Sequence, residues 1–283
     1  IAHTVGLKQT ILFPFVTLGS LINFCDCLMA GGTGRQNHSE VGSSYIHFNF
    51  TPNQDKATAS LIGDVPRGVM LNQRPIFLGG QGGMVGPLRL DYGTTAAAGT
   101  ILRKDELRPN RLIFGGVGRG GNIESFPGRY SGANRIIRNN LVYVANLLAL
   151  RQWYQEIRVL FIDERFPEAL WQGLVRSADA AIRERTLRLE QLVDKMAAAG
   201  APSLAAVWPI VAGELNAQRA NRGDRRLGAA FKEKILAAIA GDGKDYIAVV
   251  KALDPAAADA GTAWLQGIVD RVLAATTEKF TKI

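Results

Sequence analysis

Two adjoining six-residue segments, Leu90-Asp-Tyr-Gly-Thr-Thr95 and Ala96-Ala-Ala-Gly-Thr-Ile101, are near copies of each other. Each begins with an apolar residue and has glycine at its fourth position. Apolar residues continue the spacing of six on both sides, at Leu78, Met84 and Leu102. Neither an α-helix nor a flat strand has a period of six. The spacing favours a parallel β-helix, in which each hexapeptide forms one side of a triangular coil and small residues allow tight corners.

The opening stretch, Ile1–Ser20, has the same spacing. Two series of apolar residues begin in it and continue beyond it in steps of six, offset by four: Leu12, Leu18 and Phe24, then Val16, Ile22 and Leu28. We therefore expect the chain to begin within the repeat. An open end of such a stack exposes unpaired backbone and apolar side chains, so we expect a cap before Ile1.

Composition changes near residue 130, from short segments rich in glycine and threonine to long stretches rich in Ala, Leu, Arg and Glu. The second part predicts helices. Their expected ranges are 134–161, a long helix from Pro167 to Gly200, 203–219, 227–240, 244–253 and 257–277. The predicted fold is a β-helix domain at 1–105, a glycine-rich connector at 106–133, and an all-α helical region at 134–283.

Bulk properties limit the partners and the compartment. The net charge of +8 favours anionic partners, but Lys and Arg are spread along the chain, so nucleic acid is not expected. The longest apolar run, Leu141–Leu150, is too short for a membrane span. Cys25 and Cys27 are the two cysteines, and neighbours one residue apart on a strand are badly placed for a disulfide. A reducing cytoplasm is the expected location.

Several motifs resemble one family. They are Glu40-Val-Gly-Ser-Ser, Ile46-His-Phe-Asn-Phe-Thr, Leu61-Ile-Gly-Asp and Thr95-Ala-Ala-Ala-Gly-Thr-Ile. Together they resemble the left-handed β-helix of hexapeptide acyltransferases. The nearest resemblance is to the acetyltransferase half of bifunctional UDP-N-acetylglucosamine pyrophosphorylases and to related sugar-1-phosphate nucleotidyltransferases. It covers about a third of the chain and implies a left-handed coil, a homotrimer, and in bifunctional members a preceding nucleotidyltransferase domain.

The resemblance also implies an activity, acetyl transfer from acetyl-CoA to the amine of an amino-sugar 1-phosphate. His38 matches the position of the family's catalytic base, although a hexapeptide is missing after it, and imidazole suits proton removal near neutral pH. Backbone N–H groups at a corner would stabilise the oxyanion formed from the thioester.

Binding residues follow from the same resemblance. Lys8 matches a lysine that contacts the sugar phosphate, and Asn49 with Phe50 matches an Asn-Tyr pair in which the amide could bind the sugar or the cofactor. The expected partner is a sugar phosphate or a nucleotide sugar. Phe50 departs from tyrosine and lacks its hydroxyl. Ala98 and Lys104 fall where the family binds CoA, with a small residue beside the pantetheine and a base on the phosphates.

Other residues and motifs allow further interpretations. His47 is expected to be structural. The spacing of His3, His38 and His47 does not match the zinc site of γ-class carbonic anhydrases, so no metal is predicted. Gly116–Gly121 fits G-x-G-x-x-G, but no helix follows it, so a glycine-rich connection is expected instead of a dinucleotide site. The alternative function is a non-catalytic trimeric platform for binding or regulation.

Overall fold

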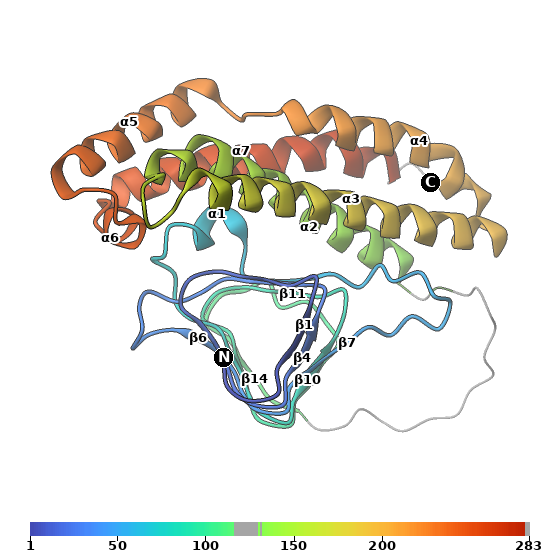
Figure 1. Cartoon of the computed structure of the whole chain (residues 1–283). Helices are drawn as coiled ribbons and strands as arrows, with labels where there is room; N and C mark the ends of the chain where they lie inside the picture. Colours follow the sequence, from blue (N-terminus) through green and yellow to red (C-terminus); the bar gives the residue numbers. More distant parts are fainter. Residues whose placement is uncertain (116–129, 131, 281–283) are drawn as a thin grey trace.

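A computed structural model describes residues 1–115, 130 and 132–280 (Figure 1). The motif Gly116–Gly121 lies outside the described residues, so its interpretation stays a prediction. Fourteen strands of two or three residues occupy the region before residue 115. They are β1 (Gly6–Lys8), β2 (Ile11–Leu12), β3 (Val16–Leu18), β4 (Asn23–Cys25), β5 (Cys27–Met29), β6 (Ser39–Val41), β7 (Ile46–Phe48), β8 (Ser60–Ile62), β9 (Phe77–Leu78), β10 (Gly83–Val85), β11 (Arg89–Leu90), β12 (Thr95–Ala96), β13 (Ile101–Leu102) and β14 (Leu112–Ile113).

These strands form three parallel sheets. Sheet 1 has the order β1-β4-β7-β10-β13, sheet 2 the order β11-β8-β5-β2, and sheet 3 the order β14-β12-β9-β6-β3. The chain visits the three sheets in turn, so most strands pair with the strand three positions later. Figure 1 shows the sheets as the sides of a triangle around a common interior.

Apolar side chains at the six-residue spacing fill this interior. Leu78, Met84, Leu90, Ala96 and Leu102 are all buried, and they lie in the successive strands β9 to β13. Single residues with positive φ end the strands at the corners between sheets, such as Gln9 and Asp26 between sheets 1 and 2. One left-handed residue turns the chain sharply, which keeps each strand short.

Helices form a layer over sheet 2 (Figure 1). Leu28 and Leu61 on one face of this sheet are buried, and so are Met29 and Ile62 on the other face. Since successive side chains of a strand point to opposite faces, sheet 2 is covered on both sides. The layer consists of α2 (Ala133–Glu156), the 3-10 turn η1 (Arg158–Phe161), α3 (Glu168–Ala198), α4 (Pro202–Ala217), the 3-10 turn η2 (Gln218–Ala220), α5 (Arg225–Asp242), α6 (Tyr246–Lys251) and α7 (Pro255–Phe280).

The predicted fold class, a left-handed β-helix of hexapeptide repeats followed by an all-α region, is contradicted. The structure has three short parallel sheets of four or five strands and a helical layer packed on one of them, in an α/β arrangement. The repeat is not kept, because Gly6, Asn23, Ile46 and Gly83 align in sheet 1 at unequal intervals along the chain.

The helices are also not a separate region. Helix α1 (Val65–Gly68) lies between β8 and β9 and packs against α2 and α7. One hydrophobic core contains residues of both strands and helices, from Phe13 to Val272. Strand pairing continues to Ile113, beyond the predicted boundary at residue 105. No described helix is apolar over a length that could cross a bilayer.

Close approach between corners makes Gly42 sensitive to substitution. Gly42 and Gly80 lie at equivalent corners of successive circuits, and a Cβ on Gly42 would overlap the backbone nitrogen of Gly80. We predict that Gly42→Ala lowers the free energy of unfolding by about 2 to 3 kcal/mol, because backbone must move. Gly6→Ala is the control, since its Cβ would lie 3.7 Å from the nearest atom, Ile22 O. Urea unfolding at pH 7 measures both, and equal stabilities would contradict the close stacking.

Candidate functional site

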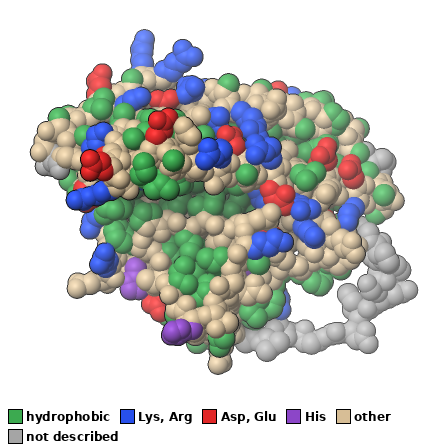
Figure 2. Space-filling view, in the orientation of Figure 1, with side chains coloured by type: hydrophobic (Ala, Val, Ile, Leu, Met, Phe, Trp, Pro, Cys, Tyr) green, Lys and Arg blue, Asp and Glu red, His purple; other side chains and the backbone are tan. Residues whose placement is uncertain are grey.

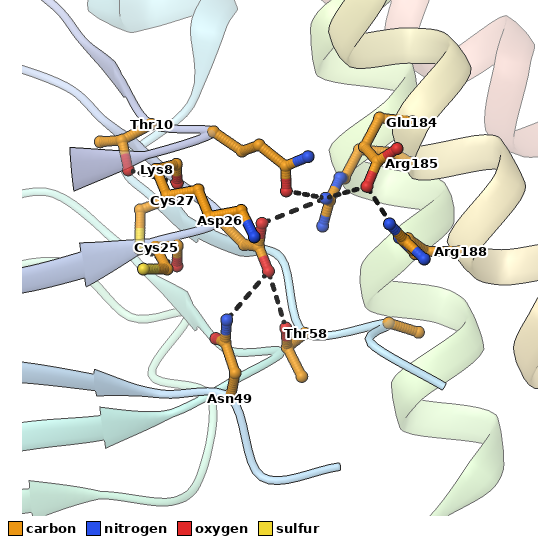
Figure 3. A network of polar contacts seen from close by, with 12 residues as sticks. Lys8, Thr10, Cys25, Asp26, Cys27, Asn49, Thr58, Glu184, Arg185 and Arg188 are labelled. Carbon is orange, nitrogen blue, oxygen red and sulfur yellow. Dashed lines mark hydrogen bonds and ion pairs between the residues drawn. The ribbon is translucent and has the colours of Figure 1, made fainter. Parts of the chain in front are cut away.

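A buried ion pair links the strands to the helical layer at the corner between sheets 1 and 2. Asp26, in the left-handed conformation between β4 and β5, directs its carboxylate toward α3 (Figure 3). Nη2 of Arg185 in α3 lies 3.1 Å from Asp26 Oδ1. The exposed fractions are 5% for Asp26 and 3% for Arg185. The same guanidinium donates to Gln9 Oε1 at 2.7 Å, while its Nη1 is buried and has no hydrogen-bond partner among the described residues.

Hydrogen bonds continue from Asp26 into the interior between the sheets. Asp26 Oδ2 accepts from Asn49 Nδ2 at 3.1 Å and from Thr58 Oγ1 at 3.0 Å. Asn49 Oδ1 is 2.9 Å from His47 Nδ1, and His47 Nε2 is 2.7 Å from Ser60 Oγ. A polar chain therefore connects Ser60 and His47 to Arg185 across the corner.

The bonding pattern assigns the tautomer of His47. Ser60 Oγ accepts a hydrogen bond from the backbone N–H of Leu88 at 3.0 Å, which leaves its hydroxyl hydrogen for His47 Nε2. His47 Nδ1 then carries the proton and donates to Asn49 Oδ1. Burial lowers the pKa of His47 to about 4, only partly opposed by the hydrogen bond to Asn49, so the imidazole is neutral at pH 7.

A serine hydroxyl on a neutral imidazole is the arrangement of a nucleophile and its base. Here both side chains are buried, with exposed fractions of 0% for Ser60 and 3% for His47. Gly86 packs so closely that a Cβ there would lie 2.7 Å from His47 Cε1. In this structure the network has no access for a substrate, and its evident role is to hold the corner together.

The outer face of sheet 1 presents a second, open arrangement. Outward-facing residues of neighbouring strands align as Lys8, Cys25, Phe48 and Val85, and Arg103 follows β13 in the same row. A groove of about 520 Å³ lies over part of this row. Its lining is Phe48, Asn49, Phe50, Val85, Ile101 and Arg103.

The predicted binding residues are distributed around this face. Phe50 lines the groove and is 72% exposed, while the side chain of Asn49 is bonded to His47 and Asp26 at its two ends. Lys8 is exposed at the β1 end of the row, and Lys104 follows Arg103. Ala98 is exposed at the corner between sheets 3 and 1. Their roles stay predictions.

His38 lies elsewhere, immediately before β6 of sheet 3. Its Nδ1 is 2.7 Å from the carbonyl oxygen of Arg35, and its Nε2 is 3.6 Å from a Glu40 carboxylate oxygen. The fold of one chain therefore does not bring His38 to the groove that Phe50 lines. Its catalytic role stays a prediction.

Sequence reasoning missed Arg185 and the contact between His47 and Ser60. A signal for Arg185 was present, because it shares helical spacing with the buried residues Ile182, Leu189 and Leu192. A charged residue on an apolar stripe needs a buried partner. Ser60 had no such signal, since its contact with His47 crosses between sheets 1 and 2.

Comparisons with known proteins found no match to a family model, to a curated protein or to a solved structure. Both cysteines are free, and among the described residues no group of three His, Cys, Asp or Glu side chains is placed to hold a metal ion.

The lowered pKa of His47 makes folding stability depend on pH. The unfolded state takes up a proton near pH 6.5 and the folded state near pH 4, so stability is lost as pH falls through this window. We predict a loss of about 2 to 3 kcal/mol between pH 7 and pH 4.5, measured by urea unfolding. His47→Leu should flatten this dependence and His38→Gln should retain it. An unchanged slope in His47→Leu would refute the assignment.

Breaking the buried ion pair should be costly. Arg185→Met leaves the Asp26 carboxylate buried without its cation, and we expect a destabilisation of about 3 to 5 kcal/mol. Arg188→Gln removes a more exposed pair with Glu184 and should cost about 0.5 kcal/mol. Asp26→Asn tolerates the left-handed backbone and completes a double-mutant cycle. Denaturant unfolding measures the free energy of unfolding of both single variants and of the double variant. If the two single losses add up to the loss in the double variant, the two side chains do not interact.

Proposed function

We propose that the outer face of sheet 1 binds an extended anionic ligand with an apolar portion, of the chemical class of coenzyme A. The observation that carries this proposal is the row of outward residues: a cation at each end and apolar side chains between them. Parallel strands lie about 4.8 Å apart, so Lys8 and Arg103 are separated by roughly 19 Å along the row. That length suits an elongated ligand better than an isolated phosphate.

Chemistry along the row supports the same class of ligand. Phe48 and Phe50 offer aromatic surface to a base or to an alkyl chain. Arg103 lines the groove and presents a guanidinium that can bind phosphate oxygens in a bidentate manner. Lys104 is the next residue in the chain and is a second exposed cation. The groove volume is within the range of small-molecule sites. The apolar surface of Phe50 would be covered by such a ligand.

Acetyl transfer to an amino-sugar 1-phosphate remains the activity that the sequence resemblance implies. It needs a base at the groove, and His38 of the same chain is not there. Non-catalytic binding is the alternative function, and the sealed contact between Ser60 and His47 favours it over catalysis by that pair. A homotrimer and a cytoplasmic location also remain expectations from sequence.

Binding of coenzyme A tests the proposal. We predict saturable binding by isothermal titration calorimetry at about 0.15 M salt, weakened about tenfold or more by Arg103→Gln and by Phe50→Ala. Phe77→Ala is the matched control, because Phe77 is a half-exposed phenylalanine on the outer face of sheet 3. Equal affinities of the three variants, or no binding at all, would reject this groove.

Catalysis is tested in the same samples with acetyl-CoA and glucosamine 1-phosphate. Turnover that is lost in His38→Ala would establish acetyl transfer with His38 as a required group. Binding without turnover would establish the non-catalytic alternative. The binding and turnover measurements therefore test the proposed ligand and the proposed reaction separately.

A further inference from the structure

Arg158 of the helical layer lies at a pocket and has no anionic partner among the described residues. The 3-10 turn η1 follows α2 and lies beside the start of α6, at one end of the layer (Figure 1). A pocket of about 730 Å³ is bounded by η1, by residues 163–166 and by residues 244–247. Arg158, the first residue of η1, is half-buried at this pocket.

Aromatic rings hold the Arg158 guanidinium in place. Its Cζ lies 3.8 Å from the ring centroid of Tyr246 and 4.2 Å from that of Phe166. Tyr246 is fixed in turn, since its hydroxyl accepts a hydrogen bond from Trp153 Nε1 at 3.1 Å and its ring packs edge-on against Phe161. Both distances are within the range of cation–π contacts, in which a ring occupies space beside the guanidinium without accepting a conventional hydrogen bond from its N–H groups.

Those N–H groups are unused within the described part of the chain. No described carboxylate lies within 4.0 Å of Arg158, and no described acceptor takes a hydrogen bond from it. Arg151, Arg219 and Arg222 of the same layer each pair with a carboxylate. Burial lowers the pKa of Arg158, because desolvation disfavours the charged guanidinium.

Apart from Arg158, the pocket is lined by three acidic and two basic side chains, so their charges nearly cancel. Asp163 Oδ1 accepts the backbone N–H groups of Arg165 and Phe166, and Asp245 Oδ1 accepts that of Ala248. Glu164 is exposed, and Arg165 and Lys244 supply two further cations. This balance suits a ligand with one anionic group and disfavours a polyanion.

We propose that this pocket binds a small molecule through one carboxylate or phosphate group, which accepts paired hydrogen bonds from the in-plane N–H groups of Arg158. A guanidinium held against two aromatic rings is preorganised for such a bidentate contact, so little side-chain entropy is lost on binding. The site lies in the helical layer and is independent of the groove on sheet 1.

Titration with inorganic phosphate and with acetate tests this site in the full chain. We expect saturable binding of one equivalent of at least one anion, weakened about tenfold or more in Arg158→Lys, which keeps the charge but loses the planar pair of donors. Arg165→Gln, at the same pocket, should change affinity less than about threefold. Circular dichroism verifies that each variant is folded.

A second measurement uses the unmodified protein. Trp153 donates to Tyr246, so its indole N–H resonance should shift on addition of the anion, while that of Trp208, which donates to Glu190, should not. Absence of any saturable shift at Trp153 would overturn the proposal, and so would unchanged anion affinity in Arg158→Lys. A shift with phosphate alone would support the site and identify phosphate as its group.

Discussion

Strand pairing in this protein depends on residues that are distant in the chain. Every strand has two or three residues, and the strands β4 to β10 each bond to the strands three positions before and after them. None of these inner strands can move along its axis without breaking ladders on both sides. Extra residues can therefore enter only at the corners, as they do between β5 and β6, between β7 and β8, and between β8 and β9.

The corners consequently hold the buried polar network of this protein. The corner between sheets 1 and 2 holds Asp26, and the segment between β7 and β8 supplies Asn49 and Thr58 to its carboxylate. Arg185 reaches the same carboxylate from α3. Because a buried charge is tolerated only when it is paired, this contact fixes where the helical layer sits on the strands.

The outer faces of sheets 1 and 2 have different surroundings. Sheet 2 is covered by helices, whereas the outer face of sheet 1 leaves Phe48 and Phe50 exposed. In the face that Figure 2 displays, many Lys and Arg side chains lie over the helical layer and hydrophobic side chains gather over the strands below it. In this orientation sheet 1 forms one side of the triangle (Figure 1), so its outer face is seen edge-on. The proposed binding of an anionic ligand rests on the open groove over that face, which Arg103 lines.

Local sequence determined the short strands, the buried positions spaced by six from Leu78 to Leu102, and the helices after residue 133. These features depend on side-chain periodicity and on turn residues, which act over a few positions. The fold class was wrong, because the repeat was extrapolated across segments that break it and because helical cover on sheet 2 has no local pattern.

The candidate site residues show the same limit, because local sequence patterns do not reveal contacts between distant residues. Sequence selected Phe50, which lines a groove, but it could not show that both ends of the Asn49 side chain are used inside the protein. Tertiary structure alone decided which residues meet: Asp26 with Arg185, His47 with Ser60, and Arg158 with two aromatic rings. Such contacts join residues far apart in the chain, and only the complete packing of strands and helices sets their distances.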